Sequence, residues 1–149
     1  MATPSLPQDL QDFLKLLNSH RVEYLLVGGY AVGYHGYPRA TGDMDIWVGV
    51  SPRNAKKLVA VVKEFGFDLP EVDENLFLQK NKVLRMGNVP LRIELLTTLS
   101  GVDFQSCYKQ RIVDTIDGIH IDIIDLENLI KNKKASGRHK DLDDVEKLS

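Results

Sequence analysis

The sequence lacks the features that mark several large classes of protein. Its one cysteine, Cys107, allows no internal disulfide and no cysteine-rich zinc site, which is typical of a reducing compartment. No apolar run reaches the roughly 18 residues that a membrane span needs. The first residues, MATPSLPQDLQDF, have neither the basic start nor the apolar core of a secretory leader. We therefore expect a cytoplasmic protein with no membrane segment.

Charge and motif content argue against further classes. Nineteen Lys and Arg against 21 Asp and Glu give a formal net charge of −2, so no global field draws the chain onto nucleic acid. The nucleophile motif G-x-S-x-G is absent, and the four histidines lack metal-ligand spacing. Gly28, Gly29 and Gly33 match neither G-x-G-x-x-G nor the phosphate-binding loop G-x-x-x-x-G-K-[ST], which argues against a dinucleotide-dependent oxidoreductase.

What remains is an ordinary globular composition with clear periodicity. At 149 residues, 43% of them hydrophobic, the chain predicts one domain over 1–149. Its apolar spacing predicts helices at 7–19, 30–35, 52–65, 72–79, 125–136 and 141–148. Strands are predicted at 24–27, 43–49, 82–86, 90–97, 111–116 and 119–124, with turns at Gly87-Asn88 and Asp117-Gly118. This pattern indicates an α+β fold, a mixed sheet of about five strands with helices packed on it.

The segment from Gly28 to Asp45 is the most informative part of the chain. A buried strand runs into Gly28-Gly29 and then a helix, which leaves backbone N–H groups free and lets an anion such as phosphate approach closely. A tight turn that binds nothing explains the two glycines as well. The glycines alone therefore leave both interpretations open.

Asp43 and Asp45 favour a metal site beside this turn. Residues two apart on a strand lie about 6.6 Å apart with side chains on one face, so both carboxylates can reach cations spaced about 3.5–4 Å apart. Without a cation the pair would repel, and one member would tend to keep its proton. Mg²⁺ is the usual ion for carboxylate and phosphate oxygens.

Glu94 is the candidate for a third acidic ligand. It is the only acid in the segment PLRIELLT, and a lone carboxylate in an apolar strand is unusual unless it is paired or binds metal. The alternative is an ion pair with Arg92, two residues back on the same face. A second Asp-x-Asp, Asp141 and Asp143, is expected on a solvated helix face, because helical spacing points these carboxylates apart.

The order of these motifs resembles the nucleotidyltransferase superfamily, whose fold is built around DNA polymerase beta-like palms. The closer resemblance is to a small bacterial branch that includes abortive-infection-type toxin nucleotidyltransferases and lincosamide nucleotidyltransferases. The resemblance covers about residues 20 to 148. The residues that carry it are Gly28-Gly29, Pro38-Arg39, Thr41, Asp43-x-Asp45 and Glu94, followed by a tail with Asn132-Lys133, Ala135, Gly137-Arg138, Lys140-Asp141-Leu142 and Asp144.

The resemblance implies an enzyme and a site. An acceptor hydroxyl would attack the α-phosphate of a nucleoside triphosphate such as ATP, and pyrophosphate would leave. Asp43, Asp45 and Glu94 would hold two Mg²⁺ or Mn²⁺ ions, and Glu94 could also take the proton from the acceptor. The remaining residues would contact the triphosphate or the acceptor: Gly28, Gly29, Arg39, Thr41, Lys133 and Arg138.

The acceptor and the biological role stay open. By resemblance the acceptor is a partner protein of a toxin–antitoxin pair, a transfer RNA end or a small antibiotic, and a partner subunit or a second copy could complete the cleft. Many family members have Ser where this chain has Gly29, and Asp where it has Glu94. These two differences motivate an alternative, a non-catalytic module that keeps the fold and binds a nucleotide or a partner protein.

Overall fold

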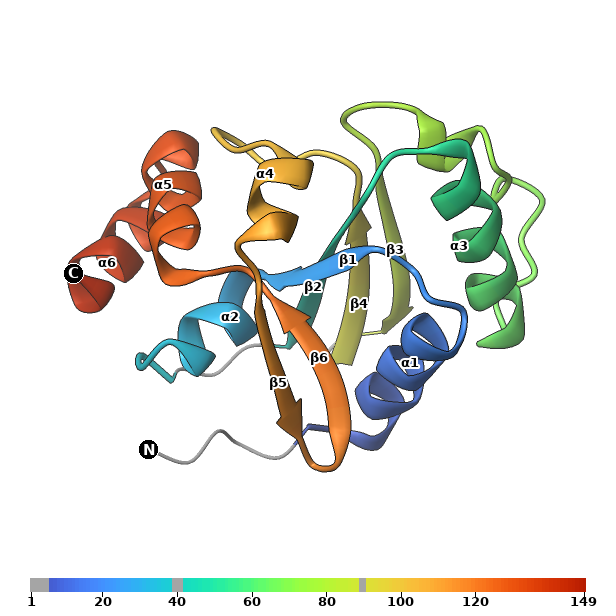
Figure 1. Cartoon of the computed structure of the whole chain (residues 1–149), viewed down its shortest axis with the longest axis horizontal. Coiled ribbons are helices and arrows are strands. Elements are labelled where there is room, and N and C mark those ends of the chain that lie inside the picture. The colour runs from blue at the N-terminus through green and yellow to red at the C-terminus, as the bar shows by residue number, and fades with distance from the viewer. Residues whose placement is uncertain (1–5, 39–41, 89–90) are drawn as a thin grey trace.

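A six-stranded mixed sheet forms the centre of the molecule (Figure 1). The computed structural model describes residues 6–38, 42–88 and 91–149. Strands β1 (Tyr24–Val27), β2 (Asp43–Val48), β3 (Val83–Asn88), β4 (Leu91–Leu96), β5 (Ile112–Ile116) and β6 (Ile119–Ile123) are ordered β3-β4-β2-β1-β6-β5. The pairs β2–β4 and β1–β6 are parallel and the others antiparallel. The predicted α+β class is confirmed. The sheet has six strands rather than about five, because every predicted strand segment joins it.

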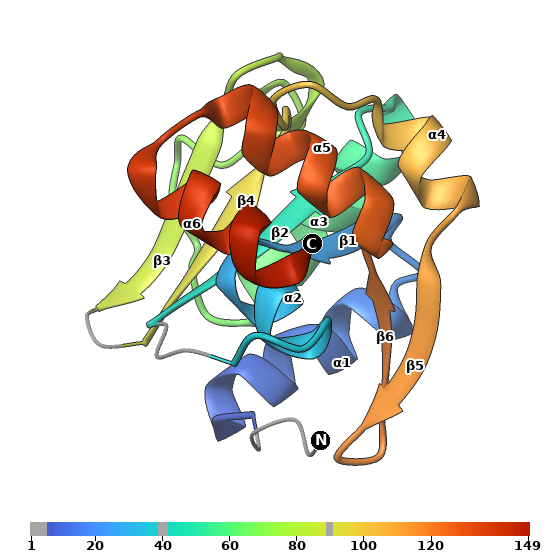
Figure 2. The same ribbon diagram turned by 90° about the vertical axis from the view of Figure 1, so that its left-hand side faces the viewer.

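Helices cover both faces of this sheet. The helices are α1 (Gln8–Ser19), α2 (Gly28–Tyr34), α3 (Pro52–Glu64), α4 (Phe104–Lys109), α5 (Leu126–Ser136) and α6 (His139–Leu148). Helices α1 and α3 lie on one face, whereas α5 and α6 lie over the other, in front of β4, β2 and β1 when the molecule is turned (Figures 1 and 2). Among the described residues, no helix is long and apolar enough to cross a membrane.

Local sequence signals explain several of the element boundaries. The Ser51 hydroxyl accepts a hydrogen bond from the Asn54 N–H at 3.1 Å, and Pro52 opens α3 behind this cap. Asp117 and Gly118 both have positive φ, 53° and 78°, which suits a two-residue hairpin turn between β5 and β6. Gly137 ends α5 with φ 67°. These three predictions are confirmed.

Other predicted boundaries were wrong. Helix α2 begins at Gly28 rather than at residue 30, because Gly28 takes a φ of +66° and turns the chain directly out of β1. The segment 72–79 forms only a 3-10 turn, Leu76–Leu78, since Phe77 is the one residue in it that is buried. Gly87-Asn88 continues β3 instead of ending it. Helix α4, capped by the Asp103 carboxylate, was not predicted.

The two faces of β2 differ in polarity: one packs into the hydrophobic core and the other carries acidic side chains. Met44, Ile46 and Val48 are completely buried on the α1/α3 side. The residues that alternate with them are the buried Trp47 and two half-buried acids, Asp43 and Asp45, which point to the side covered by α5 and α6. The apolar face therefore fixes the strand in place while the polar face stays available for chemistry.

Candidate active site

Strand register places the three predicted carboxylates on one face of the sheet. β2 and β4 are parallel neighbours, and their register sets Asp45 opposite Glu94 and Asp43 opposite Arg92. Paired residues on adjacent strands point to the same face. Asp43, Asp45 and Glu94 therefore line one pocket of about 560 Å³ between the sheet and α5/α6.

The turn after β1 lies against this row of acids. Val27, the last residue of β1, pairs with Asp45, so the chain enters Gly28 directly beside that carboxylate. A Cβ built on Gly28 would clash with Asp45 Oδ2. Gly28 and Gly29 both line the pocket. Position 28 must therefore lack a side chain, both for its positive φ and for this close approach.

Burial and the two neighbouring acids together change the ionisation of Asp45. Burial, followed by the charges of Glu94 and Asp43, raises the pKa of Asp45 to about 7, and its carboxyl group hydrogen-bonds to Glu94. Lys133, across the pocket, lowers the pKa of Asp45 but does not cancel the other effects. The site therefore has an excess of negative charge that a divalent cation would relieve.

Two arginines neutralise the other two acids in part. Arg92 donates from Nε to Asp43 Oδ1 at 3.0 Å and from Nη2 to Asp43 Oδ2 at 3.2 Å. Arg85 donates from Nε to Glu94 Oε1 at 3.0 Å. The sequence-based alternative of a Glu94–Arg92 pair was wrong. Each arginine instead pairs with the acid opposite it on the neighbouring strand.

The donor set suits a hard divalent cation, but it is not arranged around one. The three carboxylates supply only oxygen ligands, which Mg²⁺ and Mn²⁺ prefer. Within 6–38, 42–88 and 91–149, no three acidic, histidine or cysteine side chains are placed to hold a metal ion as they stand. Since Asp43 and Glu94 hold arginines, a cation would have to draw their oxygens inward. The residues fit the ion in chemistry and would need side-chain rotation to bind it.

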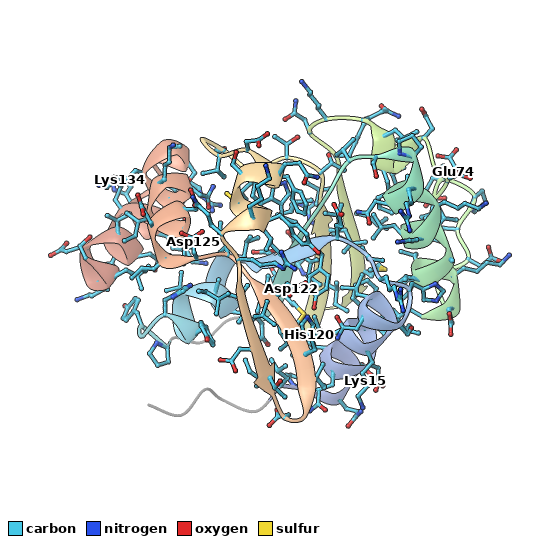
Figure 3. The ribbon with its side chains drawn as sticks, viewed as in Figure 1. Lys15, Glu74, His120, Asp122, Asp125 and Lys134 are labelled. Carbon is cyan, nitrogen blue, oxygen red and sulfur yellow. The ribbon has the colours of Figure 1, made fainter. Side chains whose placement is uncertain are left out.

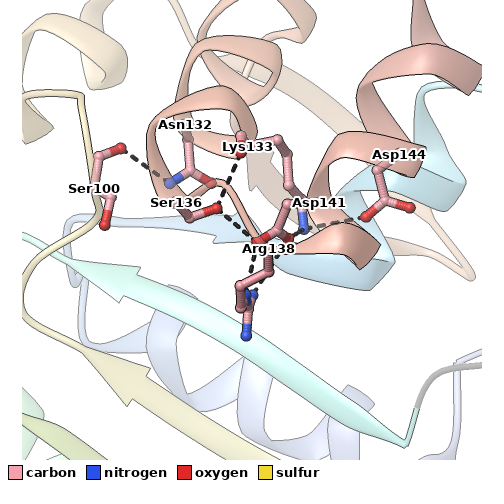
Figure 4. A network of polar contacts seen from close by, with 7 residues as sticks. All are labelled: Ser100, Asn132, Lys133, Ser136, Arg138, Asp141 and Asp144. Carbon is pink, nitrogen blue, oxygen red and sulfur yellow. Dashed lines mark hydrogen bonds and ion pairs between the residues drawn. The ribbon is translucent and has the colours of Figure 1, made fainter.

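A network of buried charges forms the opposite wall (Figure 4). Lys133 Nζ, on α5, lies 3.1 Å from Asp141 Oδ1 and 3.3 Å from Asp144 Oδ2, both on α6. Ser136 Oγ and Arg138 Nε each donate to Asp141 Oδ2 at 2.6 Å. The side chains of Asp141 and Lys133 are 0% and 6% exposed.

The expected solvated face for Asp141 was therefore wrong. Helix α6 begins at His139, two residues earlier than predicted, which turns Asp141 in its first turn toward α5. Asp143 is exposed, as expected. Burial of Asp141 opposes its ionisation, but hydrogen bonds from Arg138, Ser136 and Lys133 outweigh burial and lower the pKa of the carboxyl group.

The side chains predicted to contact phosphate fall into three groups. Lys133 lines the pocket and is buried in ion pairs with Asp141 and Asp144, whereas Arg138, which also lines it and pairs with Asp141, has a side chain that is 73% exposed. Arg39 and Thr41 lie outside the described residues. Sequence reasoning missed Arg85, Ser136 and Asp141 as parts of the pocket wall. The sequence signal for Asp141 was its position eight residues after Lys133, with the helix-ending Gly137 between them. The sequence held no signal for Arg85, because its pairing with Glu94 depends on the strand register.

Other polar and hollow regions lie away from this pocket. A hollow of about 720 Å³ on the α1/α3 side is lined mainly by apolar side chains such as Leu10, Phe65 and Ile93, and holds none of the predicted site residues. Asp122, labelled on β6 in Figure 3, lies 3.0 Å from His120 and 3.4 Å from Arg111. The hollow is also lined by Asp9, Asp12 and Glu64, from helices α1 and α3, but neither region holds the predicted carboxylates of β2 and β4, so the pocket beside Gly28 is the candidate active site.

Comparison with known proteins identifies solved structures with a similar fold. No model of a known protein family matches the chain, and neither does any curated protein. A solved nucleotidyltransferase-like antigenic protein from Paracoccidioides brasiliensis is similar with a TM-score of 0.53 and 18% identity, over 97% of this chain and 76% of that one. A Thermotoga maritima protein, provisionally assigned as a nucleotidyltransferase, is similar with a TM-score of 0.62 and 16% identity, over 93% of this chain and 88% of that one. The chain has a nucleotidyltransferase-like fold.

Proposed function

We propose that this protein is a metal-dependent nucleotidyltransferase of the cytoplasm, which transfers a nucleoside monophosphate from a nucleoside triphosphate to a hydroxyl group and releases pyrophosphate. One observation carries the proposal. Asp43, Asp45 and Glu94 come from two adjacent strands and line, beside the Gly28 turn, one pocket whose other wall carries Lys133 and Arg138. The similarity in fold to two nucleotidyltransferase-like proteins supports it.

The three carboxylates would hold Mg²⁺ or Mn²⁺, which when bound lowers the pKa of the attacking hydroxyl and neutralises charge on the leaving pyrophosphate. Asp45 is the central ligand, because it lies between Gly28 and Glu94 in the cross-strand row. Its raised pKa means that proton loss from Asp45 accompanies cation binding at neutral pH. Glu94, next to Asp45, is placed to accept the hydroxyl proton.

The rest of the pocket would position the substrate. Gly28 and Gly29 let the triphosphate approach the backbone closely, as no side chain at position 28 intervenes. Lys133 and Arg138 would face its phosphates from the other wall, with Arg138 the more accessible of the two. We propose roles in phosphate binding for Arg39 and Thr41 as well, from the sequence resemblance alone.

The acceptor is proposed at the level of its chemistry, a hydroxyl group. The branch of abortive-infection-type toxins and lincosamide nucleotidyltransferases suggests a partner protein, a transfer RNA end or a small antibiotic. The pocket opens over the basic residues Arg85, Arg138 and Lys140. A second copy or a partner subunit could supply the surface that binds the acceptor.

Label transfer tests this proposal. The protein is incubated with each α-³²P-labelled nucleoside triphosphate, Mg²⁺ or Mn²⁺, and cell extract as the source of acceptors. We expect label in a new product, and its loss with a chelator or with Asp45→Asn. Asp143→Asn, an exposed acid on α6, is the matched control and should transfer at the wild-type rate.

The alternative function has its own signature in the same experiment. A non-catalytic module would bind a labelled triphosphate without transferring label to any acceptor, while Asp45→Asn would still reduce binding. That outcome would reject the enzyme and retain the nucleotide site. Absence of both transfer and nucleotide binding would reject the site itself.

A further inference from the structure

The two arginines that pair with the catalytic acids are held differently. Arg92, on β4 opposite Asp43 of β2, makes two hydrogen bonds to Asp43, and its side chain is 33% exposed. Arg85 makes one hydrogen bond to Glu94, from the edge strand β3, and its side chain is 61% exposed. Exposed ion pairs with a single contact are weak, whereas a two-point contact fixes the guanidinium. Arg85 is therefore the easier of the two to displace.

Glu94 cannot coordinate a cation through both of its oxygens while Arg85 is hydrogen-bonded to it. Its side chain is 15% exposed, Arg85 engages Oε1, and the carboxyl group of Asp45 shares a further hydrogen bond with it. No described triad of acids is placed for a metal ion in this arrangement. A doubly charged ion competing with one guanidinium for Glu94 would release Arg85 and draw Glu94 toward Asp45.

A released Arg85 would have a second anion to bind, the triphosphate proposed for the same pocket. It lines the pocket together with Gly28, Gly29 and Arg138, the residues proposed to contact the triphosphate. A guanidinium presents parallel N–H donors that match two phosphate oxygens. Its position on β3, across β4 and β2 from the Gly28 turn, places it at the far side of the carboxylate row.

We propose that Arg85 changes partner during the reaction cycle: it neutralises Glu94 in the metal-free protein and binds phosphate oxygens of the nucleotide once a divalent cation has taken Glu94. This inference rests on the proposed function and assigns Arg85 as a substrate-binding residue. It requires Arg85 to oppose metal binding and to favour nucleotide binding, two effects of opposite sign.

Two binding measurements on Arg85→Gln test this pair of effects without turnover. Mn²⁺ affinity is measured by electron paramagnetic resonance of the free ion, and we expect it to rise about fivefold, because a weak competing ion pair is removed. At saturating Mn²⁺, affinity for an α,β-methylene nucleoside triphosphate should fall at least about tenfold, as a charge-assisted hydrogen bond is lost. Arg53→Gln, an exposed arginine at the start of α3, should change neither value.

The outcomes separate this inference from the proposed function. Tighter Mn²⁺ binding with unchanged nucleotide affinity would overturn the exchange and leave Arg85 as a simple counterion. Unchanged or weaker Mn²⁺ binding in Arg85→Gln would also overturn it. If the wild-type protein binds no Mn²⁺, the proposed function falls and the inference with it. Arg85→Lys, which keeps the charge but not the fork, should retain wild-type Mn²⁺ affinity and lose part of the nucleotide affinity.

Discussion

The two walls of the pocket hold carboxylates in opposite electrostatic states. On the α5/α6 wall, the pKa of Asp141 is lowered, because Arg138, Ser136 and Lys133 all donate to it. On the sheet wall, burial and two neighbouring acids raise the pKa of Asp45 to about 7. Both carboxylates belong to clusters of acids, so burial and acidity alone do not distinguish them.

The difference lies in where the compensating cation comes from. Lys133 is built into the first cluster and bridges Asp141 and Asp144, so that wall is complete within the chain. The second cluster has Arg92 and Arg85 at its two ends, and among the described residues Lys133, already held by Asp141 and Asp144, does not cancel the raised pKa of Asp45. A buried charge that the fold leaves uncompensated is destabilising, and acids perturbed in this way cluster at functional sites, which supports the proposed cation. The comparison therefore points to structure on one wall and to metal chemistry on the other.

Removing the centre of the compensated wall should have the largest effect. Asp141→Asn leaves Lys133 and Arg138 without their shared anion, and we expect a loss of about 3–5 kcal/mol in unfolding free energy, measured by urea titration. Because the folded-state pKa is lowered, this contribution is present above the unfolded-state pKa near 4 and disappears as pH falls below it. Asp143→Asn should stay within about 0.5 kcal/mol of wild type. An equally small change for Asp141→Asn would show that this wall does not stabilise the fold.

Adding a side chain at position 28, between the turn after β1 and Asp45, should have the next largest effect on stability. Gly28→Ala puts a Cβ against Asp45 Oδ2 at a φ of +66°, and we expect a loss of about 2–3 kcal/mol with weakened metal and nucleotide binding. Gly33→Ala, in the same helix α2 with only ordinary contacts, should be neutral or slightly stabilising. Wild-type stability and binding in Gly28→Ala would contradict the close approach.

Neutralising the uncompensated wall should stabilise the protein. The folded-state pKa of Asp45 is raised, so the folded protein binds more protons than the unfolded chain between about pH 4 and 7, and stability falls as pH rises through this window. Asp45→Asn removes that penalty, and we expect a gain of about 2 kcal/mol at pH 8 and almost none at pH 4, from urea titrations at both values. Asp43→Asn should give no such gain, because it breaks the Arg92 pair. A loss of stability at pH 8 in Asp45→Asn would contradict the assigned repulsion.

Adding a divalent cation should give the smallest change in unfolding free energy. Mn²⁺ at ten times its dissociation constant should add about 1.4 kcal/mol to the unfolding free energy. At one fixed Mn²⁺ concentration the gain should be greater at pH 8 than at pH 6, because the ion binds the ionised form of Asp45. Thermal melts with and without a chelator measure this effect. A gain that persists in Asp45→Asn would place the ion elsewhere.

Short-range sequence signals predicted most of the fold. The Ser51 cap, the Asp117-Gly118 turn and the Gly137 helix end are local, and each appears where it was predicted. Helix α4, which packs Phe104 against the distant Trp47, was missed, and the segment 72–79 was predicted as a helix rather than the shorter 3-10 turn at 76–78.

Residue spacing within one strand predicted part of the site, but contacts between strands could not be predicted from it. Asp43 and Asp45 share a face by strand alternation, but the partner of Glu94 depends on register. A turn at Gly87-Asn88 would set Arg85 opposite residues near 90, whereas the observed hairpin sets it opposite Glu94. The burial of Asp141 likewise required the two extra residues at the start of α6.

The central claim is that Asp43, Asp45 and Glu94 act together as a divalent-cation site facing a bound triphosphate. A crystal structure with Mn²⁺ and an α,β-methylene nucleoside triphosphate, with anomalous scattering to locate the ion, tests it most directly. We predict manganese density in contact with all three carboxylates and the triphosphate against Gly28 and Gly29. Manganese density remote from Asp45, or nucleotide bound in the apolar hollow on the α1/α3 side, would contradict it.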